Sequence, residues 1–421
     1  MSAPGSSRLW HPFAQMGKVK DDRLVVTSGE DVWVFDEDGN RYLDATASLW
    51  YANVGHGRDS IRVAVSDQMK QLEAYSAFGD FANPPALELA ERLSGLSPIP
   101  DARVFLTSGG GDSIDTAAKL ARRYWHEKGH DERHHLIARQ HGYHGTHGFG
   151  TSLAGIPPNR AAVGGLVEDV SVVAYDDADE LRADIERVGA ENVAAFFVEP
   201  VIGAGGVYPP PDGYIEQVAS ICRENGVLLV IDAVICAFGR LGTWYGIERW
   251  PEVVPDMITF AKGVTSGYLP LGGVVVSSEI ASPFWDEPDS PPFRHGATYA
   301  GHATCCAAAL ENIRILDEED LLPRGQDLEG ELFEQMKRAA ELPATGEVRG
   351  GKGLMAALEL APGIMESDAG APVGLAMLMR ERGVLARPLG RGVAVSPPLT
   401  VTSEHLELVG DALTDSVGRL A

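Results

Sequence analysis

Short apolar runs alternate with helical patterns through the middle of the chain, from about residue 60 to residue 280. The runs are rich in Val, Ile and Phe, and they cover residues 103–107, 193–199, 227–232, 257–260 and 272–277. A run that is apolar at nearly every position predicts a strand covered on both faces, as is typical of parallel strands flanked by helices. We therefore expect an α/β unit with a mostly parallel central sheet.

The two ends of the chain have a different pattern. Apolar runs at 32–35 and 41–43 flank an Asp/Gly/Asn-rich stretch, which predicts a hairpin. A helical pattern at 305–319 leads into a mixed tail with its own turn signals. We expect residues 56–300 to form the large domain, and residues 1–55 and 301–421 to form a smaller α+β domain from both chain ends.

Three polar residues follow apolar runs directly: Glu199, Asp232 and Lys262, each about one strand–helix–strand unit from the next. The carboxyl ends of parallel strands line the ligand crevice of an open sheet, so these side chains are expected to share a pocket. A lysine in apolar surroundings loses hydration, its pKa falls, and the amine becomes a nucleophile that forms Schiff bases. The alternative is that such residues only cap elements or pair with one another.

A glycine-rich turn at 107–113 precedes a helical pattern that continues to residue 125, with Asp112 or Ser113 as the expected N-cap. Backbone N–H groups at such a helix start can bind an anion, phosphate above all. The alternative is a turn that merely connects a strand to a helix.

The charge balance restricts the partners. The 421 residues carry a formal net charge of −25, which disfavours nucleic acid and anionic membranes. The four cysteines have no metal-site or disulfide-framework spacing. Because the sequence has neither a signal-peptide pattern at its start nor an apolar run of about 18 residues, we expect a cytoplasmic protein.

Longer motifs carry a family resemblance. Residues 231–242 (IDAVICAFGRLG) and 259–273 (TFAKGVTSGYLPLGG) resemble the signature of class III aminotransferases. Further motifs match in order across nearly the whole chain: Tyr143-His-Gly, Glu199-Pro, the stretch 295–302, Arg387-Pro-Leu-Gly and residues 397–399. The resemblance implies a fold type I enzyme that uses pyridoxal 5′-phosphate and no metal.

The resemblance also implies roles for single residues. Lys262 would form a Schiff base with the cofactor aldehyde and then move the proton between substrate and cofactor. Asp232 would hold the pyridine nitrogen protonated, with Val234 and Tyr143 on the two faces of the ring. Glu199 would also lie in this site.

The phosphate would be bound by the amides of Gly110 and Gly111, and by Thr298 from a second subunit, which implies a homodimer. Arg387 would bind substrate carboxylates, because its guanidinium matches them bidentately. In similar enzymes this arginine swings away from uncharged substrates, and Glu199 can hold its charge. Trp50 and Phe78 would form pocket walls, although buried aromatic residues are more often plain core.

Within the family, residues 47–56 and 260–268 are most similar to ω-amino acid:pyruvate transaminases. The expected reaction moves an amino group from an ω-amino acid or amine to pyruvate or a similar 2-oxo acid. The alternatives are a diaminopelargonate aminotransferase of the biotin pathway, suggested by Trp10-His-Pro and Tyr143-His-Gly, a phospho-lyase, an aminomutase, or a catalytically silent relative.

The chain departs from the family pattern at several positions. Ala233 stands where the family usually has Glu, on the strand side expected to face away from the ring. Gly109 and Gly111 replace common serines of the phosphate loop, and Ile114 replaces a common asparagine. Separately, residues 126–130 (HEKGH) match a zinc peptidase pattern, so a zinc hydrolase is the alternative of a different class. Gly129 and the polar residues after it indicate that the helix ends there.

Overall fold

The computed structural model describes residues 8–21 and 23–420. Its centre is a seven-stranded sheet with the order β4-β10-β9-β8-β7-β5-β6. The strands are β4 (Arg103–Thr107), β5 (His135–Arg139), β6 (Val170–Val173), β7 (Val193–Val198), β8 (Leu228–Asp232), β9 (Met257–Phe260) and β10 (Gly272–Val276). All five predicted apolar runs form strands of this sheet.

The sheet is mostly parallel, as predicted. The pairs β6–β5, β5–β7, β7–β8 and β8–β9 are parallel, whereas β10 is antiparallel to both β9 and β4. The expectation of a parallel strand at 272–277 is therefore wrong in direction. Every residue of β10 is buried, and burial on both faces produces an apolar run whatever the direction of the strand.

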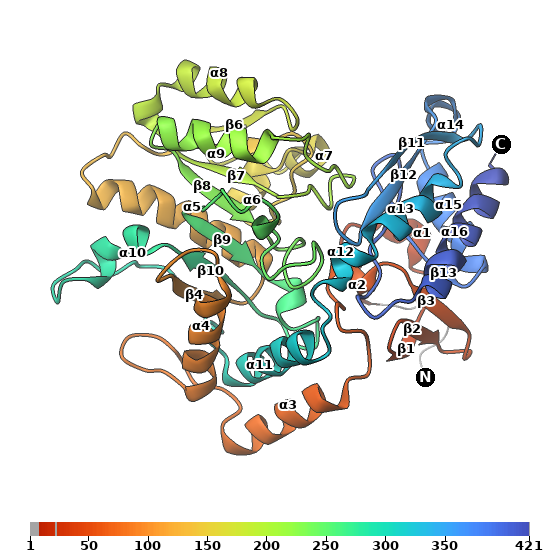
Figure 1. Cartoon of the computed structure of the whole chain (residues 1–421), viewed down its shortest axis with the longest axis horizontal. Coiled ribbons are helices and arrows are strands. Elements are labelled where there is room, and N and C mark those ends of the chain that lie inside the picture. Colours follow the sequence, from red (N-terminus) through yellow and green to blue (C-terminus); the bar gives the residue numbers. More distant parts are fainter. Residues whose placement is uncertain (1–7, 22, 421) are drawn as a thin grey trace.

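Helices cover both faces of this sheet (Figure 1). Along β7, Phe196 and Val198 join a core that includes residues of α8 (Ala178–Val188) and α9 (Tyr214–Glu224), whereas Phe197 joins a second core formed largely with α5 (Gly110–Glu127). Successive side chains of a strand point to opposite faces, so one apolar strand contributes to two cores.

The α-helices of the described residues are α1 (Met16–Val19), α2 (Ala47–Trp50), α3 (Asp59–Gln71), α4 (Pro84–Leu96), α5 (Gly110–Glu127), α6 (Gly148–Leu153), α7 (Pro157–Arg160), α8 (Ala178–Val188), α9 (Tyr214–Glu224), α10 (Ser278–Trp285), α11 (Ala303–Glu318), α12 (Arg324–Asp327), α13 (Glu329–Lys337), α14 (Pro362–Ser367), α15 (Ala371–Glu381) and α16 (Ser403–Gly418).

A smaller part, at the right of Figure 1, is built from both chain ends. The predicted hairpin is present, and its last strand pairs in parallel with β13 near the C-terminus, with Leu43 opposite Val384. This sheet contains β1 (Val26–Glu30), β2 (Trp33–Asp36), β3 (Arg41–Asp44) and β13 (Val384–Leu385). A second, antiparallel sheet contains β11 (Thr345–Arg349), β12 (Ala356–Leu360), β15 (Gly392–Val395) and β14 (Arg387–Leu389).

Helix α11 packs against α3 and α4, beneath the seven-stranded sheet in the view of Figure 1. The division of the chain at residues 55 and 300 stays a prediction, since this helix lies just beyond the second boundary. Within the described residues, no helix is both long and apolar enough to cross a membrane.

A buried arginine joins the two parts. The guanidinium of Arg240 is fully buried and donates to the carbonyl oxygens of Leu354 (2.8 Å) and Pro397 (2.6 Å) and to Oδ1 of Asn53 (3.0 Å). Burial lowers the pKa of Arg240 to about 10. Three segments far apart in the sequence are therefore held by one side chain.

Candidate active site

A cavity of about 220 Å³ lies where β7 and β8 end and α5 begins. The carboxyl ends of parallel strands and the start of a helix meet here, as expected for an open α/β sheet. Seven of the predicted site residues line it: Gly110, Gly111, Tyr143, Glu199, Asp232, Val234 and Lys262. Six further residues line it that the sequence interpretation did not assign to the site: Ile114, His144, Gly145, Thr146, His147 and Ile235.

Asp232 is the last residue of β8, and its carboxylate is fixed by neighbours. Oδ2 lies 2.7 Å from Nδ1 of His144, and Oδ1 accepts from the backbone N–H of Val234 (3.1 Å) and the hydroxyl of Thr259 (3.3 Å). Both His144 and Asp232 are buried. The Tyr143-His-Gly motif was recognised in the sequence, but the contact between its histidine and Asp232, 88 residues away, was not.

Lys262 follows β9 and begins a short 3₁₀ turn, Lys262–Val264. Its φ of 46° lies in the left-handed region, where a side chain strains the backbone. The buried side chain of Asn312 stabilises this turn by donating to the carbonyl oxygens of Gly263 (2.9 Å) and Val264 (3.0 Å). Burial lowers the pKa of Lys262 to about 8, although Asp232 and Glu199 act in the opposite direction. The fraction of neutral amine near neutral pH is therefore far larger than for an ordinary lysine.

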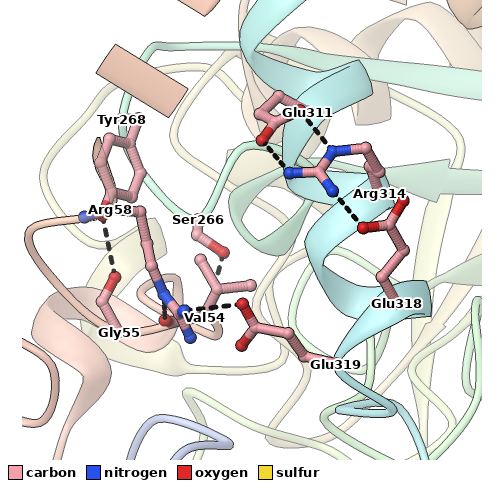
Figure 2. Close-up of polar contacts among 9 residues, drawn as sticks. All are labelled: Val54, Gly55, Arg58, Ser266, Tyr268, Glu311, Arg314, Glu318 and Glu319. Atoms are coloured by element: carbon pink, nitrogen blue, oxygen red, sulfur yellow. Dashed lines mark hydrogen bonds and ion pairs between the residues drawn. The ribbon is translucent and has the colours of Figure 1, made fainter. Parts of the chain in front are cut away.

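The loop after Lys262 is attached to the N-terminal segment (Figure 2). Ser266 accepts a hydrogen bond from the backbone N–H of Val54 (3.2 Å). The hydroxyl of Tyr268 accepts from the backbone N–H of Arg58 (2.7 Å) and donates to the carbonyl of Gly55 (3.2 Å). Residues 54–58 therefore hold the chain in place just beyond the lysine.

Glu199 shapes the loop that carries Tyr143. Its carboxylate accepts from the backbone N–H groups of Tyr143 and Gly203, both at 3.0 Å. Burial raises the pKa of Glu199, and the neighbouring charge of Asp232 raises it further. The aromatic ring of Tyr143 is thereby positioned at the cavity wall.

The start of α5 differs from the sequence expectation. The helix begins at Gly110, so the prediction of Asp112 or Ser113 as N-cap is wrong. Ser113 lies inside the helix and donates to the carbonyl of Gly109 (3.0 Å), while Asp112 accepts from the backbone N–H of Ser108 (3.3 Å). The Gly110 and Gly111 amides are thus in the first turn of an 18-residue helix, where N–H groups lack helical partners.

Val234 lies in a turn beyond the end of β8 rather than on the strand, although it still lines the cavity. Its side chain explains the neighbouring glycine, because a Cβ at Gly110 would lie 2.9 Å from Cγ1 of Val234. Ala233 is fully buried in the core and does not line the cavity, which agrees with a side chain directed away from it.

Four other predicted residues lie outside the cavity lining. Arg387 is half-buried in β14, and its charge opposes the rise in the pKa of Tyr143 that burial causes. Trp50 is buried next to the strained backbone of residues 47–50, and its indole N–H has no hydrogen-bond partner among the described residues. Phe78 and Thr298 are exposed. Their roles stay predictions.

The first two residues of the HEKGH stretch, His126 and Glu127, end α5, and residues 128–130 lie beyond the helix. His126 pairs with Asp131 and His130 with Glu132, all of them close in sequence. No group of three or more His, Cys, Asp or Glu residues in the described part of the chain is arranged to hold a metal ion.

The cavity has the groups that pyridoxal phosphate requires. An amine of lowered pKa suits its aldehyde, a fixed carboxylate suits its ring nitrogen, and first-turn amides suit its phosphate. The glycines at the phosphate end are required by close backbone packing, because a Cβ at Gly145 would lie 2.9 Å from the α-carbon of Gly111.

Comparison with known proteins gives the same assignment. Residues 16–417 match the family described as aminotransferase class-III. The putrescine–pyruvate aminotransferase of Pseudomonas aeruginosa is 36% identical over 405 residues, covering 91% of this chain and 88% of that protein. The omega-amino acid–pyruvate aminotransferase of Pseudomonas putida is 32% identical over 434 residues, covering 98% and 95%.

Among solved structures, an amine transaminase from an uncultivated Pseudomonas species in its PLP-bound form superposes with a TM-score of 0.94. It is 35% identical, and the match covers 99% of this chain and 100% of that one. The chain belongs to the class III aminotransferases, and it is a pyridoxal-phosphate-dependent enzyme of fold type I.

Proposed function

We propose that the enzyme moves an amino group from an ω-amino acid or amine to pyruvate or a similar 2-oxo acid. The observation that carries this proposal is the state of Arg387. Its guanidinium is half-buried, its Nε has no hydrogen-bond partner, and no carboxylate of the described residues pairs with it. Burial lowers the pKa of Arg387. A partly desolvated, unpaired guanidinium is suited to bind the carboxylate of an amino acid or a 2-oxo acid.

Bound pyridoxal phosphate supplies an electron sink for bond breaking at the substrate carbon. Asp232 would hold the ring nitrogen, with His144 fixing the position of its carboxylate. Nζ of Lys262 would take the proton from the substrate carbon and return it, which requires an amine that is neutral near the working pH. Tyr143 and Val234 would restrict the ring between them.

The donor class rests on similarity. Relatives named for putrescine and for ω-amino acids, both with pyruvate, match nearly the whole chain. The diaminopelargonate alternative, suggested by Trp10-His-Pro and Tyr143-His-Gly, has less support, since these two relatives are named for pyruvate.

We also propose a homodimer in which Thr298 completes the phosphate site of the partner. The loop around Phe78 lies against the segment that contains Thr298, because a Cβ at Gly296 would be 3.2 Å from Cζ of Phe78. Large exposed apolar side chains accompany them, namely Tyr75, Phe81 and Tyr299. Thr298 does not line the cavity of its own chain, and exposed apolar patches of this kind mark interfaces.

A cytoplasmic location remains part of the proposal. All four cysteines are buried free thiols, and burial raises the pKa of each. Unpaired cysteines suit a reducing compartment.

The test is a set of donor half-reactions. The yellow holoenzyme is mixed in separate cuvettes with β-alanine, 1-phenylethylamine and lysine, and the loss of its visible absorbance is followed. We expect β-alanine or 1-phenylethylamine to bleach the enzyme and pyruvate to restore the colour with formation of alanine. Bleaching by lysine alone would favour the diaminopelargonate alternative, and an enzyme that no donor bleaches would contradict the proposal.

A further inference from the structure

The phosphate end of the cavity has few charged donors. Among the lining residues of the described chain, the basic side chains are those of Lys262, His144 and His147. Lys262 would bind the aldehyde of the cofactor rather than its phosphate, and Nδ1 of His144 is paired with the carboxylate of Asp232. His147 is therefore the remaining basic side chain that could approach a phosphate.

The imidazole of His147 lies against the first turn of α5. A Cβ at Gly111 would be 3.3 Å from both Cε1 and Nδ1 of this ring, so the ring occupies the space that a side chain at position 111 would need. The close packing of Gly145 on Gly111 fixes the loop that carries the histidine. The ring thus lies beside the amides that face the phosphate.

The charged groups around His147 favour a position of its imidazole between a carboxylate and the cofactor phosphate. Nδ1 of His147 lies 3.2 Å from Oδ1 of Asp112, and Nε2 has no hydrogen-bond or ion-pair partner among the described residues. The other carboxylate nearby, Asp115, already accepts from the backbone N–H groups of Phe149 and Gly150, both at 3.1 Å. Asp112 by itself would repel a phosphate dianion, and pairing with His147 offsets that repulsion.

We propose that His147 binds the phosphate of the cofactor together with the Gly110 and Gly111 amides. An imidazolium between a carboxylate and a phosphate donates to both, Nδ1–H to Asp112 and Nε2–H to a phosphate oxygen. The glycine at position 111 gives the ring the room to do so. This inference rests on the cofactor assignment and is independent of the identity of the amine donor.

The experiment compares two ligands of the apoenzyme, pyridoxal 5′-phosphate and pyridoxal, in the wild type and in His147→Ala. Binding is measured by quenching of tryptophan fluorescence, without any amine donor. Loss of a charged hydrogen bond predicts a dissociation constant about ten- to a hundredfold higher for pyridoxal phosphate. The constant for pyridoxal, which lacks the phosphate, should not change.

His126→Ala is the matched control, because His126 is also on the surface and paired with an aspartate, but at the other end of α5. It should bind both ligands as the wild type does. If His147→Ala weakens both ligands equally, or neither, the histidine has no phosphate-specific role and the inference is wrong.

A second variant separates phosphate binding from loss of packing. In His147→Ala/Gly111→Ser, the serine hydroxyl occupies the space that the ring vacates and can donate to the phosphate. We expect this double variant to regain most of the affinity for pyridoxal phosphate that His147→Ala loses. Because no donor is present, a wrong donor class under the proposed function would leave these results unaffected.

Discussion

The charged groups at the carboxyl ends of the large-sheet strands (the strand-end edge) and those of the antiparallel small sheet (the small-sheet side) differ in how many hydrogen-bond partners the protein gives them. At the strand-end edge, Asp232 and Glu199 each have at least two hydrogen-bond partners from the protein. In β14 of the small antiparallel sheet, the buried Nε of Arg387 has no hydrogen-bond partner among the described residues. The groups that would orient the cofactor are thus fixed by the fold, whereas the group that would bind the substrate is left available.

The largest loss of activity should come from a substitution at the strand-end edge. We expect Lys262→Ala to lower kcat by more than about a thousandfold, since it removes both the nucleophile and the proton carrier. Amino transfer to pyruvate is the measurement, and circular dichroism checks the fold. The exposed Lys128→Ala is the control and should retain full activity. Normal turnover by Lys262→Ala would contradict the mechanism.

The next effect concerns the residue that joins the two regions. Arg240→Met would leave three buried acceptors without their donor, each worth about 1 kcal/mol or more. We expect the free energy of unfolding in urea to fall by about 3 kcal/mol or more. Arg314→Met removes only a surface pair with Glu311 and Glu318 (Figure 2), and should change it by less than about 1 kcal/mol. Equal losses in the two variants would show that Arg240 does not join the parts.

On the small-sheet side, Arg387→Gln should discriminate between donors. We expect kcat/KM of the half-reaction to fall about ten- to a hundredfold for β-alanine, because a charged hydrogen bond to its carboxylate is lost. The value for 1-phenylethylamine should change little. Arg391→Gln is the control, since Arg391 lies in the loop between β14 and β15 and pairs with Glu359. Equal losses for both donors would mean that Arg387 has a structural role only.

The smallest expected effect is the pH dependence of the rate at which Lys262 reacts with the cofactor. Because burial lowers the pKa of Lys262 to about 8, half of the amine is neutral at about that pH, and most of it is neutral about one pH unit higher. The rate at which the apoenzyme captures pyridoxal phosphate, followed by absorbance, should reach half of its maximum near the pKa of Lys262 and level off about one pH unit above it. A rate that continues to rise to about pH 10 would indicate an ordinary lysine.

The sequence predicted what depends on local pattern. The apolar runs identified five of the seven strands of the central sheet, because a strand that is buried on both faces is apolar. The polar residues that follow these runs identified Glu199, Asp232 and Lys262. The sequence did not reveal the contact between His144 and Asp232, which depends on how distant loops meet.

The direction of β10 and the turn at Val234 were missed for a related reason. A fully buried strand is apolar in either direction, and alternation along a strand says nothing about where the strand ends. His147 could have been found only by noting that a glycine at position 111 leaves space for a neighbour.

The anchoring of Arg240 restricts how the molecule can move. A hinge motion that separated the small sheets from the large one would break the hydrogen bonds of Arg240 to residues 354 and 397 and leave two of the three acceptors of a buried cation out of reach. The two parts are therefore expected to move as one rigid body during turnover. Substrates of different size would then be admitted by movement of side chains and surface loops rather than by opening of the whole molecule.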